Sequence, residues 1–134
     1  AVSGPGVGYD HPTGATQLIV LADETALPAA VQVAETAPDE LAVALHVEVI
    51  TADAQHTIEL EDRHTVEWYV TAAGATPGGR LVEVVRSLDG LPDHTDVWAA
   101  GEASAMQAIR THLFDGLGLA RRRATVRGYW KPAR

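Results

Sequence analysis

The chain has 134 residues, of which 46% are hydrophobic and 21% are charged, a composition typical of one globular domain. The absence of cysteine excludes disulfides, a thiolate nucleophile and cysteine-based metal sites. A net charge of −8 argues against nucleic-acid binding, and no apolar run approaches the ~20 residues of a membrane span. No secretory signal pattern opens the sequence, and we expect a cytoplasmic protein.

The charge is unevenly distributed. Residues 1–120 contain four basic and 18 acidic residues, whereas the last 14 positions contain six basic residues and no acidic one. A basic edge on an acidic body could attract an anionic ligand. The same pattern is also explained by a solvated tail that balances neighbouring acids.

The glycine-rich opening at 1–15 resembles a linker, and we expect one domain over 16–134. The continuous apolar run TQLIVLA at 16–22 predicts a strand that is covered on both faces. Apolar residues at helical spacing follow from Leu27, and Thr25 is the expected N-cap of that helix.

Strand and helix patterns then alternate. Strands are predicted at 42–50, 66–72, 96–101 and 124–130, with a short extended piece at 56–60 and a loop at GATPGG (74–79). Helices are predicted over 81–88 and from Glu102 to Leu117, where Gly118 is the C′ residue. This alternation implies right-handed crossovers. The fold class is therefore α/β, a doubly wound, mostly parallel five-stranded sheet with helices on both faces.

In such sheets the ligand binds outside the carboxyl ends of the strands, at the switch point beside the first strand. Asp23, Glu24 and Thr25 stand at that point. Two acids there are found in signalling receiver domains, which also need an aspartate after the third strand. The third strand here ends in WYVTA, without a carboxylate, so phosphotransfer has no acceptor.

An ordinary dinucleotide fold would carry a glycine-rich phosphate loop after the first strand. DETALP (23–28) has no glycine and places negative charge there. A pyrophosphate could still use the N–H groups near Ala26 and Leu27 and the Thr25 hydroxyl. The glycine at a strand-to-helix turn occurs instead in WAAGEASA, where Gly101 permits close backbone approach and Ser104 opens the helix.

Three motifs in this order are specific in combination: LIVLADETALPAA, WAAGEASAMQAIRTHL and LARRRATVRGYWK. They resemble the siderophore-interacting protein family of flavin-dependent ferric-siderophore reductases, which is similar to the ferredoxin reductases. The resemblance covers about 18–131 and matches the family's C-terminal NAD(P)H-binding domain. It implies an oxidoreductase of iron acquisition, in which electrons pass from NADPH or NADH to FAD and then to a ferric siderophore.

The resemblance also implies where these groups bind. Asp23 and Glu24 suit the nicotinamide ring and its carboxamide, while Tyr129 and Trp130 would face the isoalloxazine of FAD. The remainder of the cofactor would be lined by Thr25, Ala26, Leu27, Gly101, Glu102, Ala103 and Ser104. Arg127 and Lys131 are candidates for siderophore or phosphate contact. The simpler alternative is that Asp23, Glu24 and Glu102 only cap helices and that Trp130 is a core aromatic.

The FAD would be held mainly by a further domain in cis, so the chain alone is expected to be inactive. Family members often carry a basic residue after the third strand, where this chain has Thr71 and Ala72. The choice between NADH and NADPH therefore stays open. No catalytic side chain and no metal site are predicted, because the six histidines show no metal-ligand spacing. A non-catalytic nucleotide- or ligand-binding module that kept the fold is the alternative.

Overall fold

The structure is a computed structural model that describes residues 14–52, 55, 58–71, 74–88 and 90–132, so most of the expected linker lies outside the described residues. Five strands form one sheet in the order β3-β2-β1-β4-β5, and all four pairings are parallel. The strands are β1 (Gln17–Asp23), β2 (Ala42–Val49), β3 (Thr65–Val70), β4 (Thr95–Glu102) and β5 (Ala124–Trp130).

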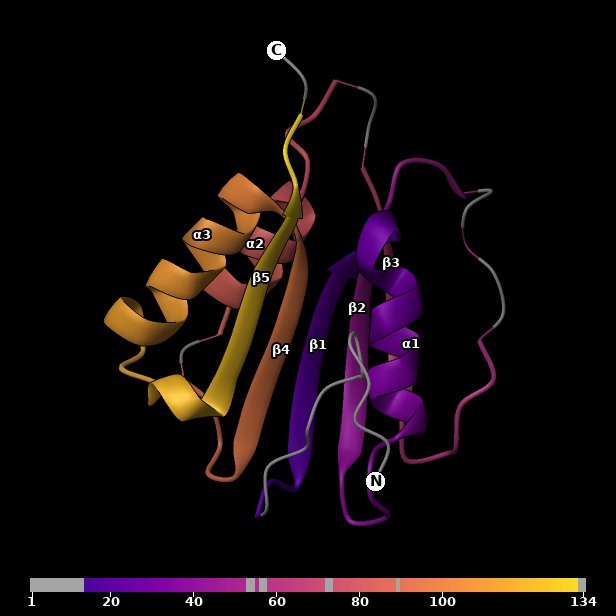
Figure 1. The fold of residues 1–134 in the computed structure, drawn as a ribbon, viewed down its shortest axis with the longest axis vertical. Helices are drawn as coiled ribbons and strands as arrows, with labels where there is room; N and C mark the ends of the chain where they lie inside the picture. Colours follow the sequence, from indigo (N-terminus) through magenta and orange to yellow (C-terminus); the bar gives the residue numbers. More distant parts are fainter. Residues whose placement is uncertain (1–13, 53–54, 56–57, 72–73, 89, 133–134) are drawn as a thin grey trace.

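Helices cover both faces of this sheet (Figure 1). Helix α1 (Leu27–Glu35) packs on one face, and helices α2 (Gly79–Arg86) and α3 (Ala103–Thr111) pack on the other. Leu18, Val20 and Leu45 belong to the core under α1, whereas Leu21, Val97 and Ala99 belong to the core under α2 and α3. The predicted doubly wound α/β fold is confirmed, with a fully parallel sheet.

The central strands are the most apolar. Every residue of β4 is buried, and β1 is buried from Val20 onward, as the continuous run at 16–22 predicted. No residue of the edge strands β3 and β5 is fully buried; each is half-buried or exposed. Because β1 lies in the middle of the sheet, its carboxyl end meets loops from both halves of the chain.

Several predicted details differ from the structure. The third strand ends at Val70, and residues 58–60 form no strand, while 56–57 lie outside the described residues. Thr25 as the N-cap was wrong: Asp23 caps a short 3-10 turn (Glu24–Ala26), and α1 continues from it. A π-helical turn (His112–Gly116) follows α3, and Gly118 at φ +69° lies beyond its C-cap, as predicted.

Candidate functional site

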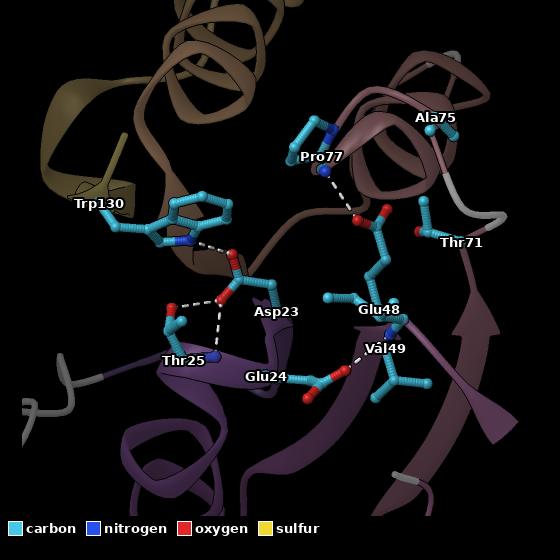
Figure 2. Close-up of a pocket in the computed structure, with 12 residues that line it drawn as sticks. Asp23, Glu24, Thr25, Glu48, Val49, Thr71, Ala75, Pro77 and Trp130 are labelled. Atoms are coloured by element: carbon cyan, nitrogen blue, oxygen red, sulfur yellow. Dashed lines mark hydrogen bonds between the residues drawn. The ribbon is translucent and has the colours of Figure 1, made fainter. Parts of the chain in front are cut away.

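A pocket of about 320 Å³ lies at the carboxyl ends of β1, β2 and β3, at the edge where the ligand was expected (Figure 2). Its acidic side chains are Asp23, Glu24 and Glu48. Val49, Ile50, Pro77 and the indole of Trp130 supply apolar surface. Because β5 and β1 lie on either side of β4, Trp130 reaches this pocket from the far end of the sequence.

The Asp23 carboxylate accepts four hydrogen bonds and is 7% exposed. Oδ1 accepts from the Thr25 amide at 3.0 Å, the Thr25 hydroxyl at 2.5 Å and the Ala26 amide at 3.3 Å. Oδ2 accepts from the Trp130 indole N–H at 2.7 Å. Asp23 therefore holds the start of the first helix and the pocket's aromatic wall at the same time (Figure 2).

Gly101 on β4 makes room for this contact. A Cβ at Gly101 would lie 2.8 Å from Asp23 Oδ2, closer than real Cβ contacts. The close approach predicted for Gly101 therefore serves the Asp23 side chain, which passes over β4 to reach Trp130.

Glu48, at the end of β2, performs a similar task for α2. Its Oε2 accepts from the Gly78 amide at 2.6 Å and its Oε1 from the Arg80 amide at 2.8 Å. Glu102, at the end of β4, accepts from the Ser104 and Ala105 amides at 2.9 and 3.0 Å and so caps α3. Both carboxylates are buried, at 5% and 3% exposure.

At each of these three turns, a side-chain carboxylate thus already accepts hydrogen bonds from the backbone amides at the start of the helix. Phosphate groups usually bind the free N–H groups of a helix N-terminus. Here the amides of Thr25 and Ala26 bond Asp23, and the Leu27 amide bonds the Glu24 carbonyl. A pyrophosphate at these turns would have to displace a carboxylate of like charge, so the pocket favours the uncharged end of a ligand.

Glu24 is the acid that stays accessible. It is exposed, and among the described residues its side chain bonds through Oε1 alone, which accepts from the Ile50 amide at 2.6 Å. This contact joins the turn after β1 to the end of β2. The second oxygen has no hydrogen-bond partner among the described residues and can accept a further hydrogen bond.

The predicted cofactor residues do not all lie at one place. Asp23, Glu24, Thr25 and Trp130 meet in the pocket. Ala26 and Leu27 are buried at the start of α1, and Tyr129 is 46% exposed at the end of β5. Gly101, Glu102, Ala103 and Ser104 form the turn into α3 and are not among the described residues that line this pocket. Residues assigned by no motif, such as Ile50, Thr71 and Pro77, complete the walls.

Thr71 carries an unexplained hydroxyl. The residue is 8% exposed, and its Oγ1 is buried without a hydrogen-bond partner among the described residues. Because a buried polar atom without a partner is unfavourable, this hydroxyl is suited to a ligand group that enters the pocket. The sequence signal was only its place after the third strand.

The basic tail is partly used for structure. Arg123 donates to the Thr95 carbonyl at 2.5 Å and lies 3.4 Å from the Asp96 carboxylate. The Arg121 guanidinium lies 4.7 Å from the centroid of the Phe114 ring. Arg127 and Lys131, the candidates for siderophore or phosphate contact, are exposed on and just after the edge strand β5. The structure leaves both free to meet solvent.

Two histidines and a tyrosine near β2 and β3 have shifted pKa values. Burial lowers the pKa of His46, against the opposing effect of Glu67, and His46 Nδ1 lies 2.8 Å from the Tyr69 hydroxyl. Burial also raises the pKa of Tyr69. Burial lowers the pKa of His64, whose Nδ1 accepts from the Val43 amide at 2.9 Å. His64 therefore supports the start of β2.

Within the described ranges, no three His, Asp or Glu side chains converge as ligands for one metal ion. No helix in the described part of the chain has the length and apolar character needed to cross a membrane.

The family model described as "Siderophore-interacting protein" matches residues 15–133, nearly the whole chain. The chain belongs to the siderophore-interacting protein family. A siderophore utilization protein from T. fusca shares 32% identity and a TM-score of 0.79 over 92% of this chain, and SipS of Aeromonas hydrophila shares 25% identity and a TM-score of 0.75 over 91%. The Acinetobacter baumannii family member, at 18% identity and a TM-score of 0.84, shows the fold.

An uncharacterized protein of Mycobacterium tuberculosis is 28% identical over 98% of this chain. The chain spans 50% of that relative's length, and it covers 48% of the T. fusca and 54% of the Aeromonas chain. These relatives are therefore about twice as long as this chain.

Proposed function

We propose that this chain is the NAD(P)H-binding domain of a flavin-dependent ferric-siderophore reductase. The observation that carries the proposal is the pocket between Asp23 and Trp130, which lies at the carboxyl edge of a parallel sheet in a chain of the siderophore-interacting protein family. That edge is where such sheets bind nucleotides.

The pocket's walls fit the nicotinamide end of the cofactor. Val49, Ile50 and the Trp130 indole offer apolar surface to a flat ring, and Ile50 is 67% exposed. The accessible oxygen of Glu24 is positioned to accept from a carboxamide NH₂. Asp23 acts on the ring indirectly, because its four hydrogen bonds hold Trp130 and the Thr25 turn in place.

The bound cofactor supplies a hydride, which a flavin accepts. The residues of this chain bind and orient the ring and keep water from one of its faces. FAD would be bound mainly by a second domain in the same protein, and the exposed Tyr129 ring would face it. The electrons would reduce the iron of a ferric siderophore in the cytoplasm, with Arg127 and Lys131 available to its anionic groups.

Energy transfer from tryptophan to reduced nicotinamide tests the proposal. If the ring lies beside Trp130, excitation of tryptophan should produce nicotinamide emission when NADPH or NADH is added to the chain. The Trp130→Phe variant should lose most of this signal, whereas Trp98→Phe, which changes a tryptophan that is 5% exposed in the core, should keep it. No signal in the wild type, or an equal signal in Trp130→Phe, would contradict the proposal.

A further inference from the structure

The edge strand β3 is attached to β2 at its amino-terminal end by a side chain. The first registered pair of the two strands is Ala44 and Thr65. One step earlier, the Val43 amide donates to Nδ1 of His64 at 2.9 Å, at the place where a longer β3 would supply a main-chain carbonyl. The His64 imidazole therefore extends the backbone ladder between β2 and β3 by one hydrogen bond.

This hydrogen bond is buried and requires the neutral form of the ring. Val43 is 1% exposed and His64 is 8% exposed, so the Val43 amide loses its acceptor at a high cost in free energy. Because Nδ1 accepts, the neutral ring has its proton on Nε2. Nε2 is buried too, and it has no hydrogen-bond partner among the described residues. The position of His64 thus stabilises one protonation state and one tautomer.

The residues beside His64 attach the same end of β3 to the loop that follows α1. The Arg63 guanidinium donates to three carbonyls of residues 37–41 at 2.9 to 3.2 Å. Arg63 also lies 2.7 Å from the Glu61 carboxylate, and the Glu61 carbonyl accepts from the His64 amide at 2.9 Å. Residues 61–64 therefore form a clasp between the start of β3, the start of β2 and the loop at 37–41.

We propose that His64 is a proton-sensitive latch that holds the amino-terminal end of the edge strand β3. The neutral ring accepts from Val43 and keeps the clasp closed. A proton on Nδ1 turns this acceptor into a donor that faces the Val43 N–H, and it places a second cation beside Arg63. The clasp then opens at the amino-terminal edge of the sheet, which is the edge opposite the pocket.

The direction of the pH dependence follows from the surroundings of His64. Burial and the neighbouring Arg63 lower the pKa of His64, and Glu61 opposes them. When the clasp opens, the ring is exposed and takes up a proton below about pH 6.5, whereas the closed clasp disfavours that proton. The open form is therefore least populated above this pH, and its population should rise about tenfold between about pH 7.5 and about pH 5.5.

Amide hydrogen exchange of the chain, measured by NMR and corrected for the intrinsic rates, tests the latch. The protection of the Val43 amide should fall about tenfold over that pH interval, while Val20 in the central strand β1 keeps its protection. His64→Asn places an amide oxygen near Nδ1 without a titrating ring, so the fall at Val43 should disappear. His46→Asn is the matched control, because burial also lowers the pKa of His46, and the fall should remain.

A second measurement needs no variant. The ring ¹⁵N chemical shifts of His64 should show the proton on Nε2 at pH 7.5 and protons on both nitrogens in acid. A proton on Nδ1 at pH 7.5 would overturn the inference. So would a Val43 protection that does not change with pH in the wild type, or one that falls equally in His64→Asn.

Discussion

At the residue scale, Asp23 joins the start of the first helix to the aromatic wall of the pocket. It bonds two amides and a hydroxyl of the turn after β1, as an N-cap does, and it also bonds the Trp130 indole. The cap stabilises the first helix, whereas the indole contact fixes a wall of the pocket. The helix-capping alternative considered from the sequence is therefore confirmed for Asp23, and the same carboxylate also positions a residue that lines the pocket.

Replacing Asp23 by alanine tests this double role. The loss of the cap and of the Trp130 contact should lower the free energy of unfolding by about 2 kcal/mol. Asp39→Ala, at an exposed position after α1, should change it by less than about 0.5 kcal/mol. Urea denaturation measures both. An Asp23→Ala protein as stable as Asp39→Ala, with unchanged tryptophan emission, would contradict the assignment.

The local capping contacts of this site could be predicted from the sequence, whereas its long-range contacts could not. The order Asp23-Glu24-Thr25 before a helical pattern indicates a cap or an acidic ligand site, and Glu102 before Ser104 gives the same signal. The partner of Asp23 could not be predicted from spacing, because Trp130 is 107 positions away. The same holds for Glu48, whose partners are amides 30 and 32 positions later. Contacts of this range depend on the order of the strands.

At the scale of elements, the turn before α2 contacts both the end of β2 and the first turn of α3. Gly78 precedes α2 at φ +79°, and a Cβ there would collide with the Ala105 side chain of α3. The same residue donates its amide to Glu48. The turn therefore fixes α2 against α3 and against the end of β2. GATPGG was predicted as a loop from its composition. The requirement for glycine at position 78 could not be predicted, because it comes from the contact with Ala105 in α3, which follows later in the chain.

Two adjacent glycines give a matched pair of variants. Gly78→Ala should destabilise the protein by about 2 kcal/mol or more, because it combines a positive φ with a collision in the core. Gly79→Ala should be neutral or slightly stabilising, since nothing lies within 4 Å of a Cβ there and helix entropy improves. Thermal or urea unfolding compares them. Equal effects of the two substitutions would show that the turn is not constrained as described.

At the scale of the whole molecule, alternating strands and helices were enough to predict a doubly wound sheet, because right-handed crossovers leave few arrangements. The strand order β3-β2-β1-β4-β5 then brings the carboxyl ends of β1, β2 and β3 to one edge of the sheet, together with Trp130 at the end of β5. Sequence patterns located the edge but not all of the pocket's walls, because Val49 and Ile50 were assigned to the pocket by no motif.

The central claim is that a reduced nicotinamide ring lies between Trp130 and the ends of β1 and β2. A crystal structure of the chain with NADPH bound tests it most directly. We predict the ring in the pocket between Asp23 and Trp130, the Glu24 carboxylate hydrogen-bonded to its carboxamide, and the Asp23–Trp130 hydrogen bond intact. A cofactor bound at the amino-terminal edge of the sheet, or a pocket filled by the pyrophosphate instead of the ring, would contradict the account.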